Sequence, residues 1–144
     1  MIPILTSNPR CLQIENRKID FSPSDIQRFA SPTAWLNDVC INNGAILLLL
    51  HFNPVQSDKI AIISTLALST LDDGALWRLL RRSSFWQKNI WLVPIHRTAP
   101  YKHWVLSIVD FTHQEIKYFD SLADMNLWKE DVQVQSRYLH HWIY

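Results

Sequence analysis

The sequence predicts one α+β domain, in which helices come before and after a group of strands. Apolar residues recur at helical spacing over residues 36–52. Three runs rich in β-branched and aromatic residues follow, at 90–95, 103–110 and 115–120. Because helices and single strands do not alternate, a repeating βαβ arrangement is not expected. We therefore expect a mixed or antiparallel sheet packed with helices.

The N-terminal part of the chain predicts an irregular arm followed by helix boundaries. Residues 1–18 show neither helical nor strand-like periodicity, so we expect them to form an N-terminal arm. Three dipeptides then place a side-chain oxygen where it can cap a helix: Ser22-Pro23, Ser31-Pro32 and Asn37-Asp38. The broad apolar surface of residues 36–52 predicts a buried helix, and Pro54 discourages its continuation.

The centre and the end of the chain contribute further elements. Residues 59–69 suit either a helix or a strand, because a short apolar run fits both. Residues 74–89 predict a short amphipathic helix that ends in basic residues. Its arginines form either a partner-binding patch or a solvated face, and the small net charge favours the solvated face. Residues 123–144 predict a terminal helix.

Composition and charge argue against several classes of function. The 144-residue chain has a formal net charge of +1, which gives no electrostatic footprint for nucleic acid or an anionic membrane. Its longest apolar stretch, 45–50, is far short of the roughly 20 residues of a membrane helix, and no secretory signal is recognisable. The two cysteines, Cys11 and Cys40, match neither a disulfide framework nor a zinc site, so no metal or cofactor is expected. This cysteine usage fits a reducing compartment, and we expect an intracellular protein, nuclear or cytoplasmic.

A histidine and an aspartate mark the open end of the hairpin predicted from the second and third strands. If the hairpin loop spans 110–113, Val109 lies opposite Gln114. The same register places His103 opposite Asp120, with Cβ atoms about 4.5–5.5 Å apart, which suits an imidazole–carboxylate hydrogen bond. Such a carboxylate sets the ring tautomer and leaves the other nitrogen to take a proton from Ser or Cys. A purely structural cross-strand contact is the alternative.

Three blocks within residues 18–122 share their order and spacing with one protease family. The blocks are "KIDFSPSDIQRFASPTAWLNDVCIN", "FWQKNIWLVPIHRTAPYKHWVLSIVD" and "EIKYFDSL". They contain a Trp-Leu-Asn-Asp signature, a strand and loop that lead into His-Trp, and a strand that ends in Asp-Ser-Leu. Together they resemble the ubiquitin-like-protein-specific (SUMO/sentrin) cysteine proteases, the adenain-like branch of the papain-like enzymes. The resemblance implies a papain-like fold, with residues 19–144 as part of the catalytic domain, and hydrolysis after a C-terminal Gly-Gly.

The resemblance also implies roles for single residues. It makes His103 the general base and Asp120 the acid that orients it. It makes Trp35 and Trp104 the walls of a narrow channel for the Gly-Gly tail, and Asp38 a contact to the SUMO-type partner. Each of these three has a structural alternative, which is a core residue for Trp104, a helix-start anchor for Trp35 and a helix cap for Asp38. The family usually has glutamate after this aspartate, where this chain has valine.

The nucleophile does not fit into this pattern. In the family the catalytic cysteine follows the aspartate in an Asp-Cys-Gly context, whereas no cysteine follows Asp120. We therefore expect the sequence to stop before that cysteine and the chain alone to be inactive, as a fragment of a peptidase or as a pseudoenzyme that binds a ubiquitin-like protein. A further interpretation makes Cys40 the nucleophile, since Cys40, His103 and Asp120 follow the papain-like order and a helix start favours a thiolate. Against it, Cys40 lies on an apolar stripe that predicts burial.

Overall fold

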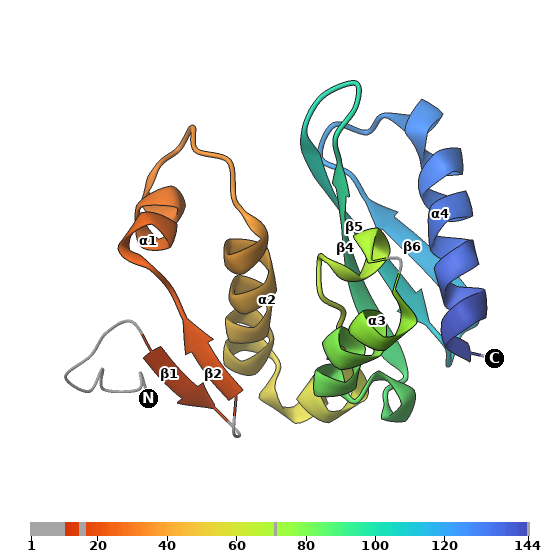
Figure 1. Cartoon of the computed structure of the whole chain (residues 1–144), viewed down its shortest axis with the longest axis horizontal. Coiled ribbons are helices and arrows are strands. Elements are labelled where there is room, and N and C mark those ends of the chain that lie inside the picture. The colour runs from red at the N-terminus through yellow and green to blue at the C-terminus, as the bar shows by residue number, and fades with distance from the viewer. Residues whose placement is uncertain (1–10, 15–16, 71, 144) are drawn as a thin grey trace. The chain divides into compact units, whose positions relative to one another are not determined.

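The computed structural model describes residues 11–14, 17–70 and 72–143, and the chain divides into two compact units, Met1–Phe52 and Asn53–Tyr144 (Figure 1). The strands are β1 (Cys11–Ile14), β2 (Arg17–Asp20), β3 (Ile60–Ile62), β4 (Ile90–Arg97), β5 (His103–Asp110) and β6 (Glu115–Phe119). The helices are α1 (Pro23–Ala30), α2 (Asp38–Phe52), α3 (Asp73–Leu80) and α4 (Met125–Ile143). Short 3₁₀ helices are η1 (Pro54–Lys59), η2 (Ala67–Ser69), η3 (Arg81–Ser83) and η4 (Phe85–Gln87). This element order confirms the α+β prediction.

The first unit begins with a hairpin that the sequence did not predict. β1 and β2 pair in antiparallel fashion, with Cys11 opposite Asp20. The expectation of an irregular arm over 1–18 is therefore wrong for 11–14 and for the start of β2, and residues 1–10 and 15–16 lie outside the described residues. Strands of four residues are too short for a period-two pattern to stand out from the background.

Two of the three predicted helix boundaries start a helix. Ser22 caps α1, since its Oγ accepts the N–H of Asp25 at 3.2 Å and the Asp25 carboxylate accepts the N–H of Ser22 at 2.9 Å. Asn37 caps α2 in the same way, with Oδ1 accepting the N–H of Cys40 at 2.9 Å. The remaining signal, at Ser31, ends α1 instead of starting a helix, and its N–H donates to the carbonyl of Arg28 at 3.3 Å.

Replacing Asn37 by alanine is expected to lower the free energy of unfolding by about 0.5–2 kcal/mol, because the first turn of α2 loses its acceptor. Urea denaturation followed by far-UV circular dichroism measures the change. Asn37→Ser keeps a capping oxygen and serves as the control. An equal loss in both variants would contradict the capping explanation.

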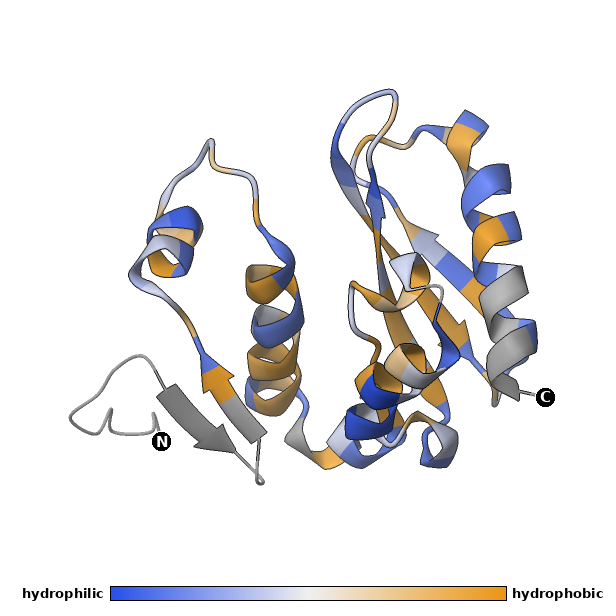
Figure 2. Cartoon of the chain, viewed as in Figure 1, coloured by the Kyte–Doolittle hydropathy of each residue, from blue (hydrophilic) through white to orange (hydrophobic). Residues whose placement is uncertain are grey.

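The prediction that α2 is a buried helix holds only in part, because most of its residues are half-buried. Hydrophobic residues occur along much of α2 (Figure 2). Its buried residue is Cys40, while Leu48 is 58% exposed and Phe52 75% exposed. The short α1 and the hairpin of the same unit are too small to cover every side of a 15-residue helix. Among the described residues, no helix has both the length and the apolar character that crossing a membrane requires.

The second unit contains a four-stranded mixed sheet in the order β3-β4-β5-β6. β3 runs parallel to β4, and the other neighbouring pairs are antiparallel. The ambiguous segment 59–69 starts as strand β3 and continues to the 3₁₀ helix η2. The three strands predicted in the second half of the chain are thereby confirmed, with β4 extended to Arg97.

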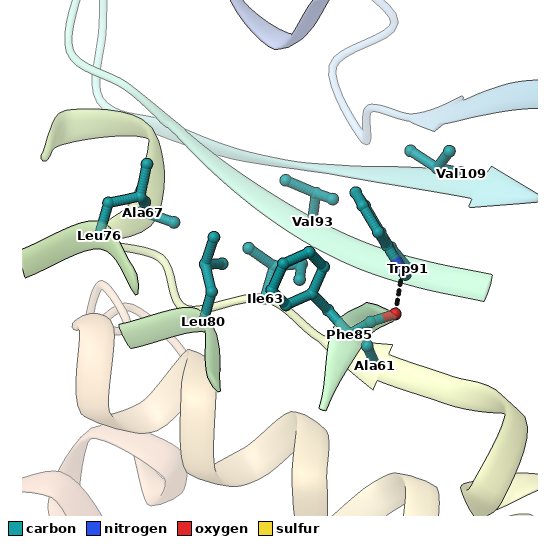
Figure 3. Packing of buried hydrophobic residues seen from close by; sticks show 9 residues of the cluster. All are labelled: Ala61, Ile63, Ala67, Leu76, Leu80, Phe85, Trp91, Val93 and Val109. Atoms are coloured by element: carbon teal, nitrogen blue, oxygen red, sulfur yellow. Dashed lines mark hydrogen bonds between the residues drawn. The ribbon is translucent and has the colours of Figure 1, made fainter. Parts of the chain in front are cut away.

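A hydrophobic core joins α3 to this sheet (Figure 3). Its buried members are Ala61, Ile63, Ala67, Leu76, Leu80, Phe85, Trp91, Val93 and Val109. The Trp91 indole N–H donates to the carbonyl of Phe85 at 3.0 Å, so the largest side chain of the cluster leaves no polar atom unpaired.

The sheet face that carries this core also carries polar groups. Arg97 lies opposite His103, and Val93 opposite Ser107, across the β4–β5 pair. Because side chains alternate along a strand, all four project from one face. α3 covers Val93, while α4 reaches Ser107, whose Oγ donates to Gln135 at 2.8 Å. The same face is therefore apolar beneath α3 and polar beneath α4.

The β5–β6 register differs by two residues from the predicted one. Val109 lies opposite Ile116 and not opposite Gln114. The Asp110 carboxylate accepts two backbone N–H groups of the turn, at 2.9 and 3.1 Å, and Asp110 remains in the ladder opposite Glu115. Gln114 closes the turn in the left-handed region, at φ 55°. A slip of two preserves the faces, so every side chain still projects as predicted.

Candidate active site

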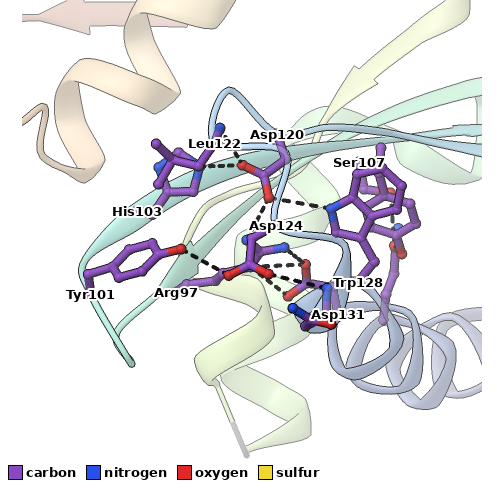
Figure 4. A network of polar contacts seen from close by, with 12 residues as sticks. Arg97, Tyr101, His103, Ser107, Asp120, Leu122, Asp124, Trp128 and Asp131 are labelled. Atoms are coloured by element: carbon purple, nitrogen blue, oxygen red, sulfur yellow. Dashed lines mark hydrogen bonds and ion pairs between the residues drawn. The ribbon is translucent and has the colours of Figure 1, made fainter.

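His103 and Asp120 are brought into contact at one end of the sheet (Figure 4). His103 is the first residue of β5 and is 6% exposed. Asp120 follows the last residue of β6, and its Oδ1 lies 2.7 Å from His103 Nε2. The predicted contact is therefore present, although Asp120 makes it from a turn and not from a paired strand position.

The turn after β6 aims the carboxylate at the imidazole. Asp120 Oδ1 also accepts the N–H of Leu122 at 2.9 Å, and its carbonyl accepts the N–H of Ala123 at 3.0 Å. An aspartate that binds its own turn in this way has a fixed side-chain direction. With Nε2 donating to the carboxylate, the neutral His103 ring has its lone pair on Nδ1.

The Asp120 carboxylate is fully enclosed by N–H donors. Its side chain is 0% exposed, and Oδ2 accepts from Arg97 Nη1 at 2.7 Å and from the Trp128 indole at 3.4 Å. Burial alone would raise the pKa of Asp120, but the donors around the carboxylate outweigh burial and hold this pKa well below its usual range. Asp120 is therefore an ionised partner for His103 near neutral pH.

Arg97 is a member of the site that the sequence analysis missed. Its Nε lies 3.2 and 3.1 Å from the two carboxylate oxygens of Asp131 in α4, and Nη2 contacts the same carboxylate. With Nε and Nη2 occupied by Asp131, the remaining nitrogen, Nη1, donates to Asp120 Oδ2. The predicted strand 90–95 stopped two residues short. Extending the alternation of buried residues from Ile95 by two residues would have placed Arg97 on the same sheet face as His103.

Of the other predicted site residues, Trp104 lies on β5, and Trp35 and Asp38 lie in the first unit. Trp104 projects from the opposite face of β5 and stacks on His96, with ring centroids 4.5 Å apart. Trp35 is 59% exposed, and its carbonyl accepts from Arg28 at 2.9 Å. Asp38 is in the first turn of α2, after the capping asparagine. Trp35 and Asp38 belong to the Met1–Phe52 unit, and their roles remain predictions.

Cys40 has the surroundings of a structural thiol. It is 1% exposed, and its S–H donates to the carbonyl of Asp25, with Sγ 3.7 Å from the oxygen. A buried thiol among apolar neighbours is inert toward substrates. These contacts argue against Cys40 as the nucleophile, while the side chain of Cys11 lies outside the described residues.

Another group of titratable side chains lies at the far end of β5. Within the part of the chain that the structure describes, Asp110, His113 and Glu115 place potential ligand atoms within 4.8 Å of one another. The hydrogen bond between His113 Nδ1 and the Asp110 carboxylate, 2.8 Å long, lowers the pKa of Asp110 and raises that of His113. This group stabilises the β5–β6 turn.

Known proteins match this chain in sequence. Residues 75–143 match the model of the Ulp1 protease family, C-terminal catalytic domain. Sentrin-specific protease 2 of Homo sapiens and that of Pongo abelii are each 31% identical to this chain over 109 residues. The match covers 74% of this chain and 18% of each relative, so the chain spans less than a fifth of their length.

Solved structures match it in fold. The SUMO protease Ulp1 with its catalytic cysteine oxidised to a sulfinic acid superposes with a TM-score of 0.52 at 23% identity, covering 80% of this chain and 51% of that one. The sulfenic acid form gives a TM-score of 0.53 at 19% identity, covering 87% and 59%. These neighbours confirm the predicted papain-like α+β fold. From this fold and from the matches in sequence, we conclude that residues 75–143 are related to the C-terminal catalytic domain of the Ulp1 protease family.

Proposed function

We propose that His103 and Asp120 are the general base and the orienting acid of a cysteine peptidase that hydrolyses peptide or isopeptide bonds after the C-terminal Gly-Gly of a SUMO-type protein. The observation that carries this proposal is the 2.7 Å contact between His103 Nε2 and Asp120 Oδ1. The match to the Ulp1 protease family suggests the reaction class, and the similar proteins are named as sentrin-specific and SUMO proteases.

The chemistry follows from the orientation of the pair. His103 Nδ1 takes the proton of a cysteine thiol, and the thiolate attacks the carbonyl carbon of the second glycine. The imidazolium then gives its proton to the leaving amine, and water releases the acyl group from sulfur. Throughout, the ionised Asp120 holds the Nε2–H and stabilises the imidazolium.

We further propose that the 144 residues alone bind a SUMO-type protein without cleaving it. The burial of Cys40 supports this, since it withholds that thiol from a substrate. Residues 19–144 would then act as part of the catalytic domain, with Trp35 and Trp104 flanking the Gly-Gly tail and Asp38 contacting the partner. Two glycines pass where any side chain would be excluded, so the channel would select by size.

A SUMO-type protein with a thiol-reactive electrophile after its Gly-Gly tests these proposals. The chain is expected to bind this probe and to form no covalent adduct in intact-mass spectrometry. A probe that lacks the two glycines is the matched control and is expected to bind more weakly. An adduct that disappears in Cys40→Ala would replace the proposal by a Cys40 peptidase.

The second candidate function is a binding module, which the burial of Cys40 favours. The intact mass of the protein from its native source, measured with and without the probe, distinguishes this candidate from the peptidase. A mass above 17.0 kDa together with a probe adduct would establish the peptidase. A mass of 17.0 kDa with binding and no adduct would establish the binding module.

A further inference from the structure

Helix α4 meets the sheet through polar side chains where a packed helix normally presents apolar ones. Trp128, Asp131 and Gln135 are spaced three and four residues apart and therefore share one side of the helix. Asp131 is 7% exposed and Gln135 1% exposed. Burying polar groups is unfavourable unless each is paired, so this stripe calls for an explanation beyond packing.

Two of these side chains act on the His103–Asp120 pair. Trp128 donates directly to Asp120 Oδ2 at 3.4 Å. Asp131 acts through Arg97, since it occupies the Nε and Nη2 edge of the guanidinium and so turns Nη1 toward Asp120. The side chain of Arg97 is 5% exposed and that of Asp131 8% exposed, so water screens this relay little.

The planar guanidinium is suited to this task. It presents its donors in a rigid fork, and one carboxylate on the Nε–Nη2 edge fixes the plane of the whole group. The direction of Nη1 then follows from the position of α4. Asp120 in turn has one oxygen for Arg97 and the other for His103, at 2.7 Å each. The chain of contacts runs from α4 to the imidazole without a gap (Figure 4).

We propose that Arg97 and Asp131 are positioning residues, which transmit the placement of α4 to the Asp120 carboxylate and hold it against His103. This inference rests on the proposed function, because positioning matters only if the pair takes up and releases a proton. It makes α4 a part of the site, although α4 itself provides no general acid or base.

Gln135 supplies a matched control within the same stripe. It lies one turn after Asp131, and its Oε1 accepts from Ser107 at 2.8 Å and from the Tyr118 hydroxyl. Its Nε2 is buried and has no partner. Gln135 is thus equally buried and polar, and its hydrogen bonds reach the sheet at Ser107 and Tyr118, away from Asp120.

The test is nuclear magnetic resonance on the full 144-residue chain labelled with ¹³C-aspartate and ¹⁵N-histidine. In the parent chain, Asp120 is expected to keep its carboxylate shift well below pH 3.8, and neutral His103 to be the Nε2–H tautomer. The double variant Arg97→Gln with Asp131→Asn removes both charges together, so no unpaired charge is left by the change at α4. In it, the Asp120 titration midpoint is expected to rise toward 3.8 and the two His103 ring ¹⁵N shifts to converge.

Gln135→Leu is expected to leave both signals as in the parent chain. Unchanged signals in the folded double variant, or equal changes in Gln135→Leu, would overturn the proposal. If the double variant does not fold, Arg97→Lys replaces it, because lysine keeps the charge but lacks a fork that spans both carboxylates. An unchanged His103 tautomer in Arg97→Lys would also overturn the proposal. These readouts involve no substrate, so they stand or fall separately from the Gly-Gly binding that tests the proposed function.

Discussion

Replacement of Arg97 by alanine is expected to lower the free energy of unfolding by about 3–5 kcal/mol at neutral pH. The guanidinium lies between the buried carboxylates of Asp120 and Asp131. Removing it leaves two like charges enclosed together, with only His103, Trp128 and backbone donors left on the Asp120 side. A loss of this size is a large share of the stability of a small domain.

The pH dependence of this loss identifies its cause. The pKa of Asp120 lies below 3.8 in the folded chain, so its contribution is complete above about pH 4 and is lost as the pH falls through the depressed value. Without Arg97 this pKa rises, and protonation relieves the repulsion at higher pH. Urea denaturation of parent and variant is therefore expected to differ most near pH 7 and progressively less below about pH 4.

Arg78→Ala is the control for the loss of an arginine. Arg78 is 67% exposed and lies 3.9 Å from the exposed Asp72, so we expect little change in stability. If Arg97→Ala proved equally mild, or if its effect did not vary with pH, the ion pairs beneath α4 would not be the stabilising contacts inferred from the structure.

Replacement of Trp91 by alanine is expected to cost about 3–5 kcal/mol. Trp91 is 3% exposed and packs edge-on against Phe85 and Phe111, with ring centroids 5.2 and 4.7 Å away. Its removal opens a cavity at the centre of the second unit. It also leaves the Phe85 carbonyl without the indole N–H.

Trp86→Ala removes an equal volume from the surface. Trp86 is 51% exposed and stacks on Trp77, with centroids 5.3 Å apart. Urea denaturation followed by circular dichroism is expected to show a markedly smaller loss than for Trp91→Ala. Equal losses would mean that the indole contributes through its size alone and not through its burial.

The contact between His103 and Asp120 could be predicted from sequence, because it depends on the sheet face from which the side chains project and not on the exact strand register. His103 begins one strand and Asp120 directly follows the next, and alternation predicts both side chains on one face even after a slip of two residues. The slip itself could not be foreseen. It depends on the Asp110 carboxylate binding the turn and on Gln114 adopting a left-handed backbone, where a glycine would have been the usual signal.

The parts that were missed depend on tertiary contacts. Arg97 was left outside the predicted strand 90–95, because an arginine is rarely buried in a strand unless carboxylates pair with it. Those carboxylates come from the turn after β6 and from α4, which no local pattern connects with β4. The incomplete burial of α2 was missed for a related reason, since an apolar surface predicts burial without saying how much of it the neighbouring elements cover.

The contacts around Asp120 bear on how the chain folds. The partners at the site are 8, 17 and 23 residues from Asp120 in sequence, and Arg97 and Asp131 are 34 apart. The entropic cost of closing a loop rises with the length of the loop, and short sequence separations favour rapid folding. One contiguous stretch of chain from β4 to α4 thus specifies the whole arrangement, which can form early and without waiting for segments distant in sequence.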